Sequence, residues 1–159
     1  MAVSDRSCVM NQGQILQSGS AEDLYYRSKT PFVAQFIGRV NMLSGEIKDV
    51  QPNTLVVEIL NTKVTINNTL AQPRKGQKVY VVLRLESVQL IPSTKAPLLG
   101  RVASRTFLGE KAEYLVECQG TILQVLNIDR GPHSIFTEGM EVGIQLIEDT
   151  ITVLEEAIP

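Results

Sequence analysis

Two stretches of this chain repeat each other, and this repeat limits the possible folds more than any other feature. Residues 76–91 and 139–154 align from end to end without a gap. Gly76, Val79 and Leu83 align with identical residues in the second stretch. Each stretch reads as a turn, a strand, a tight acidic turn and a second strand. The sequence therefore predicts two related units.

The chain beyond Gly38 is dense in short β-type stretches. Apolar and β-branched residues alternate or run together, and turn residues separate the runs. We expect ten strands, over residues 42–49, 55–60, 63–67, 78–85, 88–91, 99–107, 113–118, 121–127, 141–147 and 150–154. Two five-strand units of this size fit a pair of small Greek-key barrels such as OB-folds. We place the first half at about 42–92 and the second at about 97–155.

Residues 1–38 have a different character. Two short apolar runs flank a turn at residues 11–13, which predicts a hairpin. Ser20 with Asp23 at the third position after it predicts the start of a short helix. Thr30 followed by Pro31 predicts a second helix, which we expect to end at Gly38 as a C′ residue. A hairpin alone is marginal in water, so we expect residues 1–38 to be the least stable part.

Composition narrows the class of protein. The 159 residues are 43% apolar, so a folded core is expected. A net charge of −2, 5% aromatic residues and no tryptophan argue against a nucleic-acid-binding OB-fold, which needs a basic track and stacking aromatics. No apolar run approaches the length of a membrane span or a signal peptide. Cys8 and Cys118 lack metal-ligand spacing, and we expect two core thiols without a disulfide.

The N-terminal part resembles the end of the nucleotide-binding domain of ATP-binding cassette (ABC) importer ATPases. The resemblance lies in residues 4–13 (SDRSCVMNQG), 19–25 (GSAEDLY) and 32–38 (FVAQFIG). It implies that residues 1–38 are the C-terminal remnant of such a domain, with its missing strands upstream. The chain then reads as a C-terminal piece of a longer protein.

The β-rich part, residues 39–159, resembles the transport-associated OB module (TOBE) of the same proteins. Residues 84–88 (RLESV) match a segment usually read Arg-Pro-Glu-x-Val, with Leu85 in place of the proline. Residues 107–114 (FLGEKAEY) match a Phe-Leu-Gly…Tyr pattern. The resemblance implies a mainly β fold of tandem OB-like barrels, preceded by a short hairpin and two helices.

The sequence lacks the motifs of an ATP-hydrolysing site. A phosphate-binding loop needs Gly-x-x-x-x-Gly-Lys-Ser/Thr, and no window matches it. Leu43-Ser44-Gly45-Glu46 is like the ABC signature loop, but it leads into a strand and has Glu46 where the second glycine belongs. We expect no enzyme activity, cofactor or metal for these residues, whereas the resemblance implies ATP and Mg²⁺ in the parent. The single histidine, His133, is expected to be a solvated loop residue.

Two groups of residues are candidate functional sites. Phe36, Ile37, Gly38 and Asn41 stand where the ATPase-like part meets the β part. We interpret them as an interdomain hinge, with Gly38 allowing the chain to turn and Asn41 bridging the two parts. The bland alternative is core packing plus a helix cap.

A second group lies in the second β half. Ser104, Arg105, Phe107, Leu108 and Gly109 are candidate partner or ligand contacts. The alternative is a glycine turn with Phe107 and Leu108 packed inside. An oxyanion site would need clustered N–H donors, hydroxyls and a cation. Residues of these types are present but form no recognisable site, namely Ser44, Lys48, Ser104, Arg105 and Thr106.

The leading functional hypothesis follows from the resemblance. It implies a regulatory and dimerisation region of the ATP-binding subunit of an ABC importer, whose parent couples ATP hydrolysis to solute uptake. The implied partners are a second copy of the chain and transmembrane permease subunits, at the cytoplasmic face of the membrane, with no nucleic acid. The alternatives are a sensor of oxyanions or sugars in the same transporter and, less favoured, a nucleic-acid-binding OB protein. Polyamine, iron, sugar and phosphonate importers share the module, so the sequence names no substrate.

Overall fold

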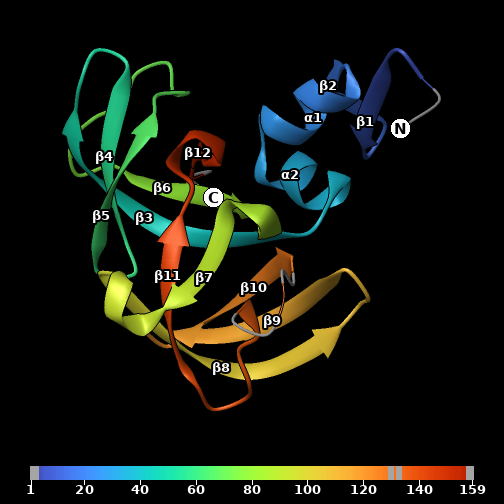
Figure 1. Ribbon diagram of the computed structural model, residues 1–159. Helices are drawn as coiled ribbons and strands as arrows, with labels where there is room; N and C mark the ends of the chain where they lie inside the picture. The colour runs from blue at the N-terminus through green and yellow to red at the C-terminus, as the bar shows by residue number, and fades with distance from the viewer. Residues whose placement is uncertain (1–3, 129–130, 132–133, 157–159) are drawn as a thin grey trace.

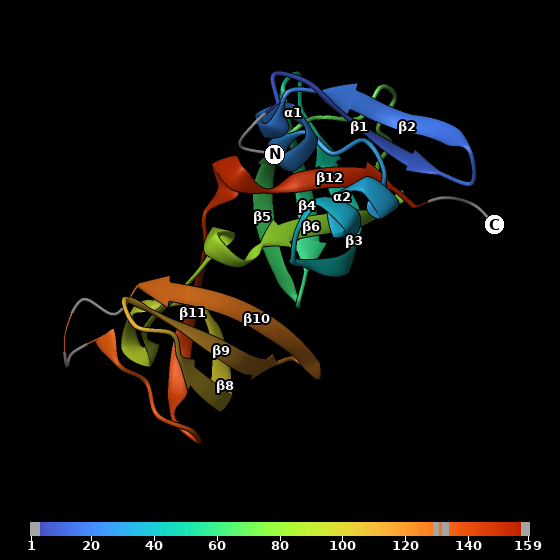
Figure 2. The ribbon, with the colours of Figure 1, turned by 90° about the vertical axis from the view of Figure 1, so that its right-hand side faces the viewer.

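The computed structural model describes residues 4–128, 131 and 134–156 of the chain. It consists of two curled five-stranded sheets and a small N-terminal segment packed beside the first of them (Figure 1). Seen from the side, the first sheet and the N-terminal segment form one lobe and the second sheet forms the other (Figure 2). The mainly β, OB-like fold predicted from the sequence is confirmed.

The expected strands are present, with ends that differ slightly from the predicted ones. The first sheet has the order β12-β6-β3-β4-β5 and the second the order β7-β11-β8-β9-β10. The bounds are β3 Val40–Val50, β4 Thr54–Ile59, β5 Thr62–Asn67, β6 Lys78–Arg84, β7 Val88–Pro92, β8 Leu98–Phe107, β9 Lys111–Cys118, β10 Thr121–Ile128, β11 Glu141–Leu146 and β12 Thr152–Glu155. Short 3₁₀ turns lie between strands at η1 Leu85–Ser87, η2 Ser93–Lys95 and η4 Glu148–Thr150.

The two sheets exchange one strand each, which corrects the predicted halves. Strand β7 pairs with β11 in the second sheet, and β12 pairs with β6 in the first. In both repeats the acidic 3₁₀ turn carries the chain from one sheet to the other, and the Ile147 amide donates to the Ser87 carbonyl where the two crossings meet. The ranges 42–92 and 97–155 therefore do not form separate barrels. Each repeat completes the other half's sheet.

Matching details confirm that the sheets follow one plan. The register of β3 shifts between Ile47 and Asp49, and that of β8 shifts at the equivalent place, between Val102 and Ser104. The amides of Ile47 and Val102 donate to the corresponding backbone carbonyls, those of residues 77 and 140. A bulge of this kind bends a strand and lets a sheet curl.

One continuous core joins both sheets. It contains Ile47, Leu55 and Leu83 from the first and Tyr114 and Leu123 from the second, all fully buried.

Close packing inside the second sheet explains a glycine in β8. A Cβ at Gly100 would lie 2.6 Å from a Val116 methyl and 2.8 Å from Ile144 Cδ1. Contacts that short would force the neighbouring side chains to move out of a tightly packed core. Glycine is therefore required at this position.

The N-terminal segment comprises β1 Ser7–Asn11, β2 Gln14–Gly19, α1 Ala21–Tyr26 and α2 Pro31–Ile37. Ser20 and Thr30 cap the helices as predicted, by accepting from the Asp23 and Val33 amides. Val9, Leu24 and Val33 form a small core of their own.

The two cysteines differ in environment. Cys118 is buried but Cys8 is exposed, so the expectation of a core thiol at Cys8 is wrong. Cys8 lies in the hairpin of β1 and β2, where one face packs against the helices through Val9 and the alternate residues face solvent.

No helix in the part of the chain that the structure describes is long and apolar enough to cross a membrane.

Candidate functional site

The most elaborate polar site in the described chain surrounds Arg84, at the end of β6. The residue is only 3% exposed. The Arg84 guanidinium donates to the carbonyls of Tyr25 at 2.7 Å, Ala34 at 3.0 Å and Gly38 at 3.3 Å, and to the Ser28 hydroxyl at 3.3 Å. These carbonyls lie towards the C-terminal ends of α1 and α2, where helix carbonyls lack partners within the helix. A single cation thus caps two helices and fixes the N-terminal segment to the first sheet.

Tyr25 and Glu86 complete this site. The Arg84 guanidinium lies 4.1 Å from the centre of the Tyr25 ring, in a cation–π contact. The Tyr25 hydroxyl donates to Glu86 Oε1 at 2.7 Å. Burial, followed by the hydrogen bond and negative charge of Glu86, raises the pKa of Tyr25 to about 12. Burial lowers the pKa of Arg84, which nevertheless stays charged at neutral pH.

The link between α2 and β3 reaches the second sheet as well. Arg39 forms a two-point ion pair with Glu113 of β9 and also donates to Gln124 Oε1 at 3.0 Å. The Asn41 side-chain amide donates to the Gln124 carbonyl at 2.8 Å and accepts from the Gln124 amide at 2.7 Å. Asn41 thereby takes the place of a strand neighbour at the outer edge of β10. Residues 38–41 therefore contact both sheets.

The structure places the hinge candidates in different environments. Phe36 is 64% exposed and stacks on Phe32, whereas Ile37 packs against the small N-terminal core. Gly38 is extended, with φ −177°, so the expected C′ role is wrong. Asn41 joins the two sheets and not the N-terminal segment to the β part. Bending at these residues remains a prediction.

The second group of candidates lies at the far end of β8. Phe107 and Leu108 are 64% and 55% exposed, so the interpretation that they pack inside is wrong. Gly109 adopts φ +92°, which suits the tight turn after them. Arg105 donates to the Tyr114 hydroxyl at 3.1 Å and lies near the Phe107 ring, while Ser104 is half-buried. A partner contact at Phe107 and Leu108 remains a prediction.

The residues considered for an oxyanion site are divided between the two sheets. Ser44 and Lys48 lie on β3 of the first sheet, and residues 104–106 lie on β8 of the second. Lys48 is engaged by Glu46 at 2.9 Å and by Glu58 at 3.4 Å. His133 lies outside the described residues. The described residues hold no cluster of His, Cys, Asp and Glu that suits a metal ion.

Sequence reasoning did not single out Arg84, Tyr25 or Arg39 as site residues. Arg84 carried a signal, since it is a charged residue directly after the apolar run of a predicted strand. Such a residue needs partners, and helix ends are ready acceptors. Nothing in the sequence placed Arg39 beside Glu113, 74 residues away.

Known proteins share parts of this architecture. The TOBE domain family matches residues 81–154. A crystal structure of the cytoplasmic molybdate-binding protein ModG, with molybdate bound, shares the fold: the TM-score is 0.62 and the identity 18%, over 73% of this chain and 96% of that one. Residues 81–154 are thus similar to the TOBE domain family, and the fold is that of ModG.

Curated relatives extend the match to almost the whole chain. The spermidine/putrescine import ATP-binding protein PotA of Borreliella afzelii is 34% identical over 158 residues, covering 98% of this chain and 42% of the relative. The Fe(3+) ions import ATP-binding protein FbpC of Fusobacterium nucleatum is 32% identical over 161 residues, covering 98% and 41%. Over almost its whole length the chain is therefore similar to part of the ABC importer ATP-binding proteins. It spans about two fifths of the length of these relatives.

Proposed function

We propose that this chain is the regulatory and dimerisation region of the ATP-binding subunit of an ABC importer. Its role is to hold two subunits together and to connect their ATPase domains to the β domain. The relatives support the class of subunit, because they are import ATP-binding proteins. The whole subunit would hydrolyse ATP with Mg²⁺ and work with permease subunits at the cytoplasmic face of the membrane.

The observation that carries the proposal is the attachment of the N-terminal segment. This segment resembles the end of an ATPase domain, and Arg84 fastens both of its helices to the first sheet. Arg39, directly after α2, continues the attachment to the second sheet, and Asn41 joins the first sheet to the second. A movement of the ATPase domain would therefore displace both sheets together, as a coupling element requires.

Replacing Arg84 in the complete subunit tests this role. Arg84→Ala should lower solute uptake per ATP hydrolysed in vesicles that contain the permease. The reason is that the helices of the N-terminal segment lose the hydrogen bonds that hold them to the first sheet. Arg101→Ala is the matched control, since Arg101 also donates to a backbone carbonyl, that of Gly139, but far from the N-terminal segment. An unchanged uptake-to-hydrolysis ratio in Arg84→Ala, with normal subunit content, would refute the coupling role.

Ligand sensing is the second candidate, and only the fold favours it. The ModG likeness supports an architecture that accommodates molybdate in that protein. In this chain the candidate oxyanion donors lie on different sheets, and Lys48 already pairs with two carboxylates. Thermal shift measurements with molybdate, sulfate, phosphate and sugars separate the two functions. A saturable rise in melting temperature would favour the sensor.

A further inference from the structure

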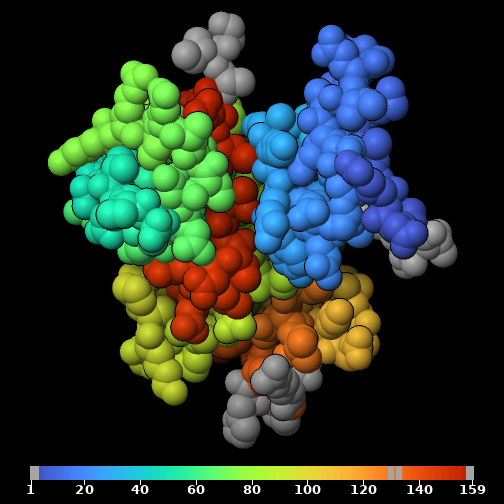
Figure 3. All heavy atoms as spheres, turned by 90° about the horizontal axis from the view of Figure 1, so that it is seen from above, coloured from blue at the N-terminus to red at the C-terminus, as the bar shows by residue number. Residues whose placement is uncertain are grey.

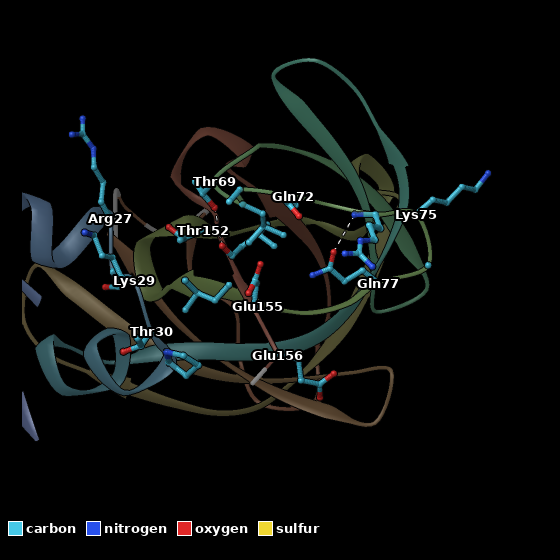
Figure 4. Close-up of a pocket in the computed structure, with 18 residues that line it drawn as sticks. Arg27, Lys29, Thr30, Thr69, Gln72, Lys75, Gln77, Thr152, Glu155 and Glu156 are labelled. Atoms are coloured by element: carbon cyan, nitrogen blue, oxygen red, sulfur yellow. Dashed lines mark hydrogen bonds between the residues drawn. The ribbon is translucent and has the colours of Figure 1, made fainter. Parts of the chain in front are cut away.

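The surface of the described chain is hollowed in more than one place. An open cleft of about 1400 Å³ runs along β12, between the connection of α1 to α2 and the loop of residues 69–77 (Figure 3). Figure 4 shows Arg27 and Lys75 extending outward from its opposite walls, with Glu155 between them. The Val153 carbonyl on its floor already accepts from the Thr69 hydroxyl at 2.8 Å. The charges of this cleft are therefore too spread out to hold one small ligand.

A smaller pocket lies between the two sheets and is mainly apolar. This inter-sheet pocket has a volume of about 220 Å³ and is lined by β5 of the first sheet and by η2 and β11 on the side of the second. Its apolar lining includes Val64, Leu98 and Ile144, all buried. Small-molecule sites are usually apolar with a few polar groups, and those for drug-sized ligands start at roughly 300 Å³. The inter-sheet pocket thus suits a ligand with only a few carbon atoms.

Close packing of the chain after η2 on β11 builds one wall of the inter-sheet pocket. Gly143 lies in β11, and a Cβ there would be 2.6 Å from the Ala96 Cβ and 2.9 Å from Ile91 Cγ1. The first repeat has Tyr80 at the aligned position, where a neighbouring segment could not lie so close. The second repeat therefore departs from the first at the place where this wall forms.

Two lysines and one glutamate stand among the lining residues. Lys63 comes from β5 and Lys95 from η2, so the two cations approach the inter-sheet pocket from different sheets. Glu148 belongs to η4, which packs against β5. None of the three forms an ion pair with a residue that the structure describes. Charges of this kind beside an apolar pocket can orient a charged ligand.

From this arrangement we propose that the inter-sheet pocket binds a small monocarboxylate with a short branched apolar body. Its carboxylate contacts Lys63 and Lys95, and its body lies against Val64 and Ile144. Inorganic phosphate and sulfate are disfavoured, because the apolar lining would leave several of their oxygens without donors. Glu148 disfavours a second negative charge on the ligand, since like charges repel.

A ligand in this place would bridge the two sheets. Lys63 belongs to the first sheet, Lys95 adjoins the second, and Glu148 lies on the crossing from β11 to β12. A ligand that binds only the folded chain raises its stability as the site fills. The union of the two sheets would then respond to the concentration of a small acid. This role is separate from the proposed dimerisation and from the attachment through Arg84.

Methyl NMR of the full chain, titrated with sodium isovalerate, is the first test. The methyl resonances of Val64, Ile91 and Ile144 should shift saturably, with a Kd on the order of 1 mM for so small a ligand. Lys63→Met with Lys95→Met should weaken binding by about tenfold or more, because methionine keeps the apolar stem and removes the charge.

The matched control is Lys29→Met with Lys75→Met. It removes the same charge from the walls of the open cleft and should leave the Kd for isovalerate unchanged. Circular dichroism confirms that both double variants are folded.

Two further probes separate the parts of the ligand. The alcohol 3-methylbutanol has the apolar body of isovalerate without its charge, and inorganic phosphate has charge without the body. Each should bind at the inter-sheet pocket at least about tenfold more weakly than isovalerate.

Several outcomes would overturn the proposal. One is the absence of saturable shifts at these methyls with isovalerate on the order of tens of millimolar. Equal binding of the alcohol would reduce the inter-sheet pocket to an apolar hollow, and equal binding of phosphate would reduce it to a patch of charge. A Kd that the folded Lys63 and Lys95 double variant leaves unchanged would also contradict the assigned contacts.

Discussion

The first sheet carries Arg84 where the second carries Ile147, and Asn41 where the second has Ala96. The two sheets are otherwise built from strands in the same order. Arg84 and Asn41 hold the N-terminal segment and the edge of β10, whereas Ile147 and Ala96 have no side-chain hydrogen-bonding groups. The plan of the sheet is therefore set by shared apolar positions, and a few polar substitutions give one sheet its attachments.

The exchanged strands offer the strongest test of this likeness. Val153 in β12 and Val88 in β7 are both buried and occupy the strand that each sheet receives from the other repeat. Val153→Asp and Val88→Asp should each destabilise the chain by about 3 kcal/mol or more, because each buries an unpaired charge. Denaturant unfolding followed by circular dichroism should show both sheets lost in one transition. A separate transition for one sheet would break the comparison.

The Arg84 position tests the difference between the sheets. Arg84→Ala should cost about 2–4 kcal/mol, since it leaves buried helix-end carbonyls without donors. Ile147→Ala, at the equivalent position, should cost about 1 kcal/mol because only apolar contact at a half-buried site is lost. Urea unfolding at neutral pH gives both values. Equal losses would mean that Arg84 acts only as a packing residue.

The sequence predicted the strands well but not their partners. The ten runs and the internal repeat were readable because apolar alternation is local. The exchange of β7 and β12 between the sheets could not be predicted from the sequence. Both sheets offer an equivalent edge next to the same acidic turn. The residues of the repeat therefore do not indicate which sheet the strand after the acidic turn joins.

The candidate site shows the same limit. Asn41 was expected to bridge two parts of the protein, and it does bridge, but between β3 and β10. Its partner is the backbone of Gln124, 83 residues away, which any side chain at that position would offer. For Phe107 and Leu108 the alternative of packing inside is wrong, since both are exposed at the end of β8. Long-range backbone contacts and strand ends leave little trace in a single sequence.

A smaller effect is expected from the Asn41 contact with β10. Asn41→Ala should lower stability by about 1–2 kcal/mol, through the loss of its two hydrogen bonds to Gln124. The Gln124 amide should then exchange its proton faster with solvent. The reverse change, Ala96→Asn, is the matched control in the second sheet and should leave that amide unaffected. Unchanged exchange at Gln124 in Asn41→Ala would contradict the role of Asn41.

The smallest effect concerns a surface charge cluster on the first sheet. Hydrogen bonds from Lys78 and Lys48 lower the pKa of Glu46 to about 2. Because the folded pKa lies below the ordinary value of 4.5, this stabilisation is present above about pH 4.5 and is lost as the pH falls towards 2. Glu46→Gln should flatten stability across this window. Arg101 occupies the equivalent position in the second sheet, and Arg101→Gln should leave the acid slope unchanged.

Native-state hydrogen exchange of the full chain tests the central claim most directly. The account predicts that amides of α1 and α2 exchange first, that those of the two sheets exchange later and together, and that Arg84→Ala speeds exchange in α1 and α2 while they still exchange before the sheets. The single core and the exchanged strands make the sheets one unit, whereas Arg84 holds the N-terminal segment to it. Exchange of one sheet well before the other, or helices as protected as the sheets in Arg84→Ala, would contradict it.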